Sequence, residues 1–173
     1  MNHMVEHVDK ASDNYELMDK WTLWGHLPHD TDWSLESYKQ IYEISSIKDA
    51  VVLNENLPDS IIKNCMLFLM RKGIKPTWEY PKNYDGGSFS FKINNRFVIN
   101  SWKNLSYVLL GETLTNPEIG DYINGISVSP KKNFCIIKIW LSNCKYNNPD
   151  IIKDIEGLCK NGCLFKKHIT VNS

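Results

Sequence analysis

The sequence has no excess charge of either sign. Its 20 Lys and Arg residues balance its 20 Asp and Glu residues, which gives a formal net charge of zero. A protein that holds a long nucleic acid by its phosphates presents a strongly basic face. The composition therefore argues against that class, while it leaves open a pocket for one nucleotide. The sequence also has no apolar run of membrane-spanning length, and we expect no membrane partner.

The five cysteines form no recognisable disulfide or metal-binding pattern. Their odd number and scattered spacing favour free thiols in a reducing compartment. Cys159 and Cys163 lie closest together, but a zinc site would need a second such pair. We therefore expect neither a metal nor another cofactor.

The motifs of common catalytic folds are missing as well. The sequence contains no P-loop, no Gly-x-Ser-x-Gly nucleophile motif and no dinucleotide-binding fingerprint. The spacing of His26, His29 and His168 favours no nucleophilic Cys–His pair. The chain is therefore predicted not to be an enzyme.

The 173 residues suffice for one domain with its own core. Residues 1–16 are polar and without periodicity, which predicts a flexible N-terminal tail before a domain at 17–173. Strands are expected at 17–26, 64–71, 88–93, 125–129, 134–141 and 164–171. Helices are expected from Ser45 and Ser46 to about Asn56, at 102–110 with Ser101 as the cap, and at 150–160. Segment 34–44 combines a helical period with a strand-like composition.

These elements predict an α+β fold. About three helices lie between several antiparallel strands, and the helices must cover one face of the sheet to bury their apolar stripes. The other face then stays partly open. We expect a curved antiparallel sheet with the helices on its convex face and a binding surface on its concave face.

Segment 73–87 carries the clearest functional signal. Trp78 and Glu79 follow Pro76, and Gly86 and Gly87 close the segment, so the pair is predicted to lie on a loop. A large aromatic side chain beside a carboxylate on an exposed loop costs stability unless it binds something. A flat, electron-poor ring with hydrogen-bond donors would suit both groups. An ordinary loop aromatic beside a solvated carboxylate is the alternative interpretation.

Several motifs occur in a specific order along the chain. They are Trp21-Thr-Leu-Trp24, Asp32-Trp33, Gly73-Ile-Lys-Pro-Thr-Trp78-Glu79, Lys82-Asn83, Gly86-Gly87, Trp102, Leu109-Leu-Gly-Glu112, Gly125-Ile126 and Ile137-Lys-Ile-Trp140. This series resembles the initiation factor 4E family, whose members bind the 7-methylguanosine cap of messenger RNA in eukaryotic translation initiation. The resemblance favours a strand at 34–44. It implies capped mRNA as the ligand, a role in promoting initiation and a cytoplasmic location. The content of Asn, Ile and Lys is typical of AT-rich genomes, such as those of protists and large DNA viruses, and a viral protein would act in the host cytoplasm.

By this resemblance, Trp33 and Trp78 sandwich the methylated base from two loops at the same end of the sheet. Base stacking is worth roughly 1–3 kcal/mol, and a desolvated cation–π contact adds about 2 kcal/mol. Glu79 would accept two N–H donors from guanine, which adenine does not offer, and Trp140 would pack near the 7-methyl group.

The resemblance also places the residues that bind the cap phosphates. Lys131 stands where the family has an arginine, whereas Ile136 and Ser88 stand where it has a lysine and another arginine. Lys132 and Lys138 are candidates to compensate. Because lysine cannot form the bidentate fork of arginine, we expect a weaker dependence on the triphosphate than usual, or a shifted cap preference.

A second departure concerns the face that binds a scaffold factor of the 4G type or a repressor. Leu17, Ile47, Val51 and Tyr107 occupy the positions that grip a Tyr-x-x-x-x-Leu helix in the family, but Val51 replaces a tryptophan and Tyr107 a leucine. We therefore expect that the usual scaffold helix binds poorly and that a divergent equivalent binds instead.

Three other functions remain open. The chain could be a cap-binding repressor or decoy, or a non-catalytic interaction module whose pocket has lapsed. A cap hydrolase would need a carboxylate cluster or metal ligands, and the acidic residues at 36, 43, 49 and 55 do not form a recognised one. Lys166, Lys167 and His168 are predicted to be a solvated face.

Overall fold

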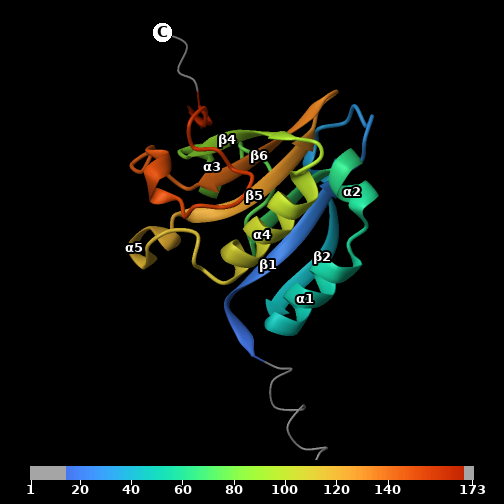
Figure 1. The fold of residues 1–173 in the computed structure, drawn as a ribbon, viewed down its shortest axis with the longest axis horizontal. Helices are drawn as coiled ribbons and strands as arrows, with labels where there is room; N and C mark the ends of the chain where they lie inside the picture. The colour runs from blue at the N-terminus through green and yellow to red at the C-terminus, as the bar shows by residue number, and fades with distance from the viewer. Residues whose placement is uncertain (1–14, 170–173) are drawn as a thin grey trace, which may run out of the picture.

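The computed structural model describes residues 15–169. A seven-stranded antiparallel sheet in the order β2-β1-β3-β5-β6-β4-β7 carries the fold (Figure 1). Its strands are β1 (Glu16–His26), β2 (Lys39–Ser46), β3 (Met66–Arg71), β4 (Gly87–Asn94), β5 (Ile123–Pro130), β6 (Phe134–Leu141) and β7 (Leu164–Lys167). Residues 1–14 of the expected tail lie outside the described residues, and Glu16 already belongs to β1. No helix in the described part is long and apolar enough to cross a membrane.

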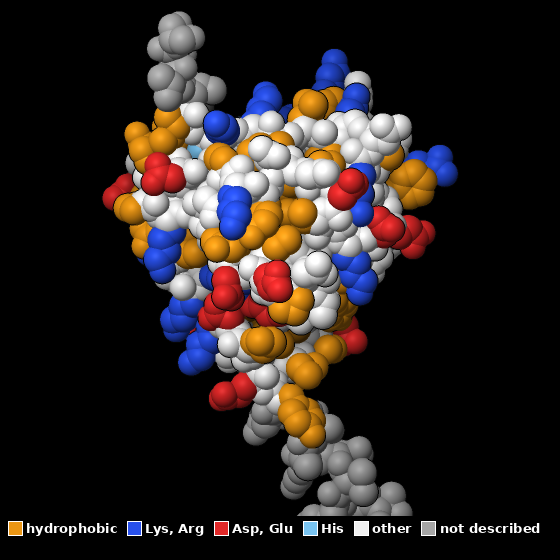
Figure 2. Space-filling model, turned by 90° about the vertical axis from the view of Figure 1, so that its left-hand side faces the viewer, with side chains coloured by type: hydrophobic (Ala, Val, Ile, Leu, Met, Phe, Trp, Pro, Cys, Tyr) orange, Lys and Arg blue, Asp and Glu red, His pale blue; other side chains and the backbone are white. Residues whose placement is uncertain are grey.

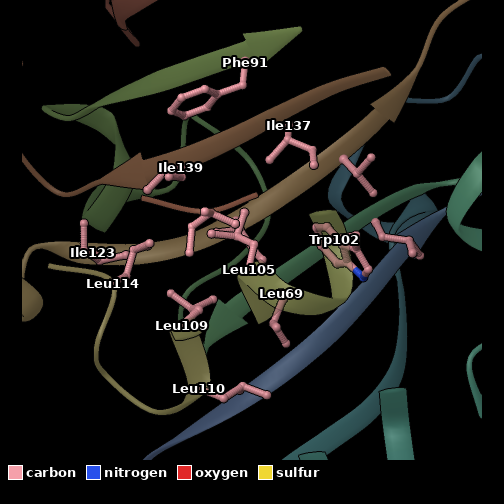
Figure 3. Packing of buried hydrophobic residues seen from close by; sticks show 14 of the residues in the cluster. Leu69, Phe91, Trp102, Leu105, Leu109, Leu110, Leu114, Ile123, Ile137 and Ile139 are labelled. Carbon is pink, nitrogen blue, oxygen red and sulfur yellow. The ribbon is translucent and has the colours of Figure 1, made fainter. Parts of the chain in front are cut away.

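Three helices cover one face of the sheet, as the α+β prediction requires. They are α1 (Ile47–Asn56), α2 (Asp59–Asn64) and α4 (Val98–Leu110). Trp102 and Leu105 of α4 lie in one apolar cluster with Leu69 and Ile137 of the sheet (Figure 3), and all four are at most 1% exposed. Because side chains alternate along a strand, every second residue of each strand faces the helices. The residues between them lie on the opposite face of the sheet.

The predicted helix around residue 50 is confirmed, and its start has a clear physical cause. Ser46 accepts a hydrogen bond from the backbone N–H of Asp49, while the Asp49 carboxylate accepts from the Ser46 N–H. This capping box satisfies two N–H groups that the first helical turn leaves free. The strand expected at 34–44 is β2, preceded by a 3₁₀ turn, η1 (Leu35–Ser37).

One helix prediction was wrong, and another was correct except for its start. Segment 150–160 forms only a 3₁₀ turn, η2 (Pro149–Ile151), followed by irregular chain. Its apolar residues Ile152 and Ile155 still pack into the core, so the apparent helical stripe reflects burial of an irregular segment. Helix α4 begins at Val98 instead of Trp102, and Ser101 lies inside it, where its hydroxyl donates to the carbonyl of Glu156. Helix α2 was not predicted.

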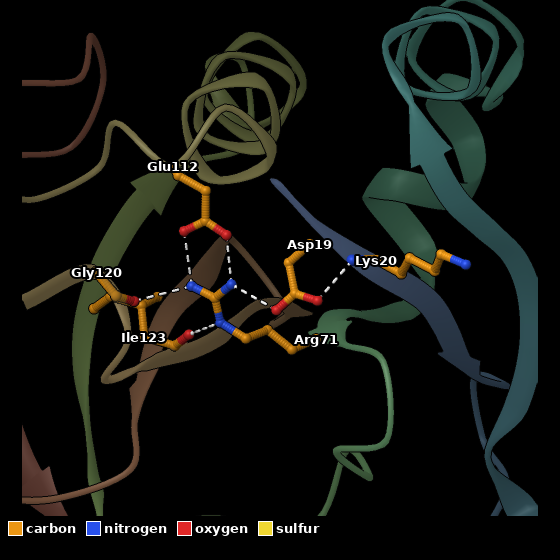
Figure 4. A network of polar contacts seen from close by, with 6 residues as sticks. All are labelled: Asp19, Lys20, Arg71, Glu112, Gly120 and Ile123. Carbon is orange, nitrogen blue, oxygen red and sulfur yellow. Dashed lines mark hydrogen bonds and ion pairs between the residues drawn. The ribbon is translucent and has the colours of Figure 1, made fainter. Parts of the chain in front are cut away.

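A polar network ties the end of β3 to its surroundings (Figure 4). Arg71 donates two hydrogen bonds to the Glu112 carboxylate and one to Asp19, at 3.0 Å. It also donates to the carbonyls of Ile123, at 2.7 Å, and Gly120, at 2.9 Å. Burial opposes the charge, but the two carboxylates raise the pKa of Arg71 above its usual value. The Arg71 guanidinium therefore stays charged and paired with Glu112 and Asp19.

Acidic and basic side chains are interspersed on the surface near α5 (Pro117–Gly120). Figure 2 shows this face, where both signs surround a central apolar area. The distribution agrees with the net charge of zero and gives this face no extended field of one sign.

Candidate functional site

The face of the sheet opposite the helices has its own small apolar cluster. The cluster consists of Trp24 on β1, Phe68 and Met70 on β3, and Trp140 on β6, together with Ile74 from the loop after β3. These five residues are at most 7% exposed. They form a firm floor on which loop residues can be positioned.

Trp33 stands on this face with half of its surface exposed (57%). It follows β1, and its ring stacks on His26 with a centroid separation of 4.1 Å and an interplanar angle of 2°. The His26 ring is itself fixed, because Nε2 donates to the carbonyl of Asp32 at 2.8 Å and Tyr38 packs against it edge-on. One face of the indole is therefore held by a buried ring, while the rest of the side chain meets solvent.

The Asp32 carboxylate shapes the loop that carries Trp33. It accepts a hydrogen bond from the backbone N–H of Ser34 at 2.8 Å, and this bond is the main reason that the pKa of Asp32 lies below its usual value. Asp30 accepts in the same way from the N–H of Asp32 at 2.9 Å. Two successive Asx turns thus fix the backbone on both sides of the tryptophan.

Trp78 is also half-exposed (43%), and it stacks on Tyr84 with a centroid separation of 6.2 Å and an angle of 17°. Tyr84 lies in a short helix, α3 (Pro81–Tyr84), within the predicted loop. Trp33 and Trp78 thus share one arrangement: each has an aromatic neighbour stacked on it and a large exposed surface.

The two tryptophan loops do not leave the same end of the sheet, so that prediction was wrong. In the antiparallel pair of β1 and β3, His26 lies opposite Met66 and Trp21 opposite Arg71. The loop after β1 therefore leaves at one end and the loop after β3 at the other. The second loop folds back over the open face, since Ile74 is buried there beside Trp24.

Glu79 follows Trp78 on the loop after β3. Its exposed carboxylate forms no hydrogen bond or ion pair within residues 15–169. Burial, and then the negative charge of Glu79, raise the pKa of Tyr38. Tyr38 in turn contacts His26, which carries Trp33. This chain of contacts brings Trp33 and Glu79, 46 residues apart in sequence, to the same part of the open face.

Asn83 anchors the loop that carries Trp78, a role that the sequence analysis missed. Its side-chain N–H groups donate to the carbonyls of Lys75 and Thr77 at 2.9 and 2.8 Å. Its side-chain oxygen accepts from Asn124 at 2.9 Å, and the residue is fully buried. Asn83 belongs to the Lys82-Asn83 motif of the sequence. Its anchoring role depends on the hydrogen bond with Asn124, which is distant in sequence.

Trp140 packs into the floor and is 7% exposed. Its indole N–H donates to the hydroxyl of Ser127 at 2.9 Å. His168 lies beside it, with ring centroids 5.0 Å apart. The indole N–H of Trp140 is thus already hydrogen-bonded, so the part of the ring that a ligand can contact is apolar.

The predicted phosphate-binding lysines lie on the hairpin of β5 and β6. Lys131 and Lys132 are exposed at its turn, and Lys138 lies within β6. Partial desolvation lowers the pKa of Lys138, and the positive charges of Lys131 and Lys166 lower it further. The charges of Lys131 and of Lys166, which was predicted to lie on a solvated face, therefore both act on Lys138.

The predicted partner residues lie on the helical side. Ile47, Val51 and Tyr107 are 50%, 36% and 42% exposed, on α1 and α4, whereas Leu17 packs against the core. Across residues 15–169, no group of three or more His, Cys, Asp or Glu residues could hold a metal ion.

Comparisons with known proteins identify the family to which the chain is similar. The family model for eukaryotic initiation factor 4E matches residues 16–170. An initiation factor 4E homolog of Acanthamoeba polyphaga mimivirus is 31% identical over 139 residues, which is 67% of this chain and 51% of the relative. Initiation factor 4E-2 of Schizosaccharomyces pombe is 28% identical over 150 residues, which is 82% of this chain and 58% of the relative. The chain thus spans little more than half the length of these two relatives.

Solved structures share the fold. C. elegans eIF4E-3, in complex with the 4E-binding protein Mextli and a cap analog, aligns with a TM-score of 0.71 at 22% identity, over 79% of each chain. Ascaris suum eIF4E-3 with an m2,2,7G cap aligns with a TM-score of 0.74 at 17% identity, over 92% of this chain and 94% of that one. The match of the family model to nearly all described residues decides the assignment, and the chain belongs to the eukaryotic initiation factor 4E family.

Proposed function

We propose that this chain binds the 7-methylguanosine cap of messenger RNA in the cytoplasm, does no chemistry on it, and promotes translation initiation. One observation carries the proposal: Trp33 and Trp78 are half-exposed, each is stacked on an aromatic neighbour, and the exposed Glu79 carboxylate lies beside Trp78. Such indoles suit a flat cationic base, and the carboxylate suits its two N–H donors. The C. elegans protein was solved with a cap analog and the Ascaris suum protein with an m2,2,7G cap.

In the proposed complex, the base lies between Trp33 and Trp78, and Glu79 accepts from the guanine edge. Trp140 then forms the apolar wall near the 7-methyl group, since its N–H is occupied by Ser127. The phosphates extend toward Lys131, Lys132 and Lys138 on the β5–β6 hairpin.

A fluorescence titration with 7-methyl-GTP and unmethylated GTP tests this function. We expect the methylated nucleotide to bind more tightly, because only its base carries the delocalised charge. W78A should weaken 7-methyl-GTP binding by about tenfold or more, since base stacking on an aromatic is worth roughly 1–3 kcal/mol. E79Q should weaken it by about tenfold or more and reduce the preference for guanine over adenine.

Two variants serve as matched controls. F97A removes another half-exposed aromatic, and E118Q neutralises another exposed carboxylate, on α5. Both should bind 7-methyl-GTP as the wild type does. Equal affinities of the wild type for the methylated and unmethylated nucleotides would refute cap binding.

A cap-binding repressor or decoy is the second candidate. It is favoured by Val51, which stands where the family has a tryptophan and is only partly exposed (36%) on α1. A small side chain there offers a scaffold helix little apolar area. The two candidates share the pocket and differ in what binds the helical face.

A further inference from the structure

A group of lysines lies on the open face without an acidic partner. Lys138 on β6, Lys131 on the hairpin turn and Lys166 on β7 are close enough for the charges of the other two to lower the pKa of Lys138, after its own desolvation. None of the three forms an ion pair with a residue in the range 15–169. Like charges held together in this way repel one another, and a bound anion would relieve the repulsion.

The sheet register places Lys166 next to the site of the base. Trp140 pairs with Ser88 across β6 and β4, and Ser88 pairs with Lys166 across β4 and β7. Paired residues on neighbouring strands project to the same face, so these three form one row across the open face. Two strand spacings separate Trp140 from Lys166, about 10 Å, which is a suitable distance for phosphates that lead away from a base at Trp140.

The hydroxyl of Ser88 is not free to donate a hydrogen bond to a phosphate. His168 Nδ1 lies 2.6 Å from the carbonyl oxygen of Asn83, which can only accept, so Nδ1 donates. Nε2 of the neutral ring then accepts from the Ser88 hydroxyl at 2.7 Å. Burial lowers the pKa of His168, and the charge of Lys138 lowers it further, against the effect of the Asn83 bond. The neutral ring therefore keeps the hydroxyl occupied.

We propose that Lys166 on β7 supplies the phosphate-binding charge that Ser88 lacks, so that Lys131, Lys138 and Lys166 together bind the phosphate chain of the cap. This inference rests on the proposed function. The cation that the family carries at the position of Ser88 on β4 would here be Lys166, the residue paired with Ser88 on β7. It also opposes the sequence-based expectation of a weak dependence on the triphosphate.

Titration of the full chain with 7-methyl-GMP and 7-methyl-GTP tests the inference. The wild type should bind the triphosphate at least about tenfold more tightly, because charge-assisted hydrogen bonds contribute about 1.5–3 kcal/mol each. K166A should lose most of this gain while its affinity for 7-methyl-GMP stays within about twofold of the wild type. K166R keeps the charge and should keep the gain, and a higher salt concentration should reduce it.

K167A is the matched control, because Lys167 is the next residue on β7 and projects to the opposite side. It should retain the full gain from the added phosphates. If K166A keeps the wild-type gain, or if the wild type shows none, the inference is wrong while cap binding stands. If the wild type also fails to distinguish 7-methyl-GTP from GTP, the proposed function falls, and the inference falls with it.

Discussion

At the scale of single residues, each of the two exposed tryptophans is positioned by an aromatic side chain that stacks on it. His26 and Tyr84 each stack on one of them, and neither neighbour was singled out for this role in the sequence. Trp33, Trp78 and Glu79 could be predicted from the family resemblance, because the order of motifs can be read directly from the sequence. The neighbours depend on the way the loops fold, which no local pattern encodes.

Removal of the ring behind Trp33 should weaken the pocket without emptying it. H26A deletes a stacked partner that is 2% exposed, and aromatic pairs are worth about 0.5–1.5 kcal/mol beyond their buried area. We expect a roughly two- to tenfold loss of 7-methyl-GTP affinity, measured by titration, in a protein that remains folded. H26F should restore most of it by keeping a flat ring there. An H26A protein with wild-type affinity would show that Trp33 needs no backing.

At the scale of elements, local signals succeeded where their cause is local. The start of α1 at Ser46 and the strand β4 depend on neighbouring residues, and both were predicted. Segment 150–160 failed because its apolar spacing is satisfied by packing on the core through an irregular path, with Gly157 at a φ of +91°. A periodic pattern reports burial, and burial alone does not specify a helix.

The cap of α1 should make stability depend on pH. Hydrogen bonds from Ser45 first, and from Ser46, hold the pKa of Asp49 below its usual value despite partial burial. Its stabilisation is therefore present above the unfolded-state pKa, about 3.9, and is lost as the pH falls through the lower folded-state pKa. D49N should reduce the unfolding free energy by about 1 kcal/mol at pH 7.

Urea unfolding between pH 7 and pH 2 would measure this effect. The difference between D49N and the wild type should shrink toward the acidic end. E55Q, which neutralises an exposed carboxylate on the same helix, should change stability much less. A D49N deficit that stays constant with pH would rule out the ionised cap as its cause.

At the scale of the whole molecule, the sheet separates two binding faces. The open face carries the tryptophan loops, and the helical face exposes Ile47, Val51 and Tyr107. The fold class could be predicted, because helices that cover one sheet face leave the other open. The path of the loop after β3 could not, because it depends on the burial of Ile74 against the apolar cluster of the open face.

The helical face should bind a standard Tyr-x-x-x-x-Leu scaffold peptide more weakly than about 1 µM by calorimetry. Val51 offers less contact area than the tryptophan of the family, so V51W should strengthen binding by about tenfold, as burial of a large side chain allows. V52W is the matched control, since Val52 is similarly exposed on the same helix but about 100° away around its axis. Tight binding by the wild type would contradict the expected divergence of this face.

The Arg71 network has a consequence for the lifetime of the native state. It joins Arg71 to residues 41 to 52 positions away in sequence, on β1, on β5 and in the segment after α4. Contacts that close such long loops form late in folding, because the entropy of loop closure must first be overcome. Interactions that are absent from the transition state act mainly on the rate of unfolding. We therefore expect replacement of Arg71 to speed unfolding and to change the rate of folding little, so that the network prolongs the lifetime of the assembled sheet.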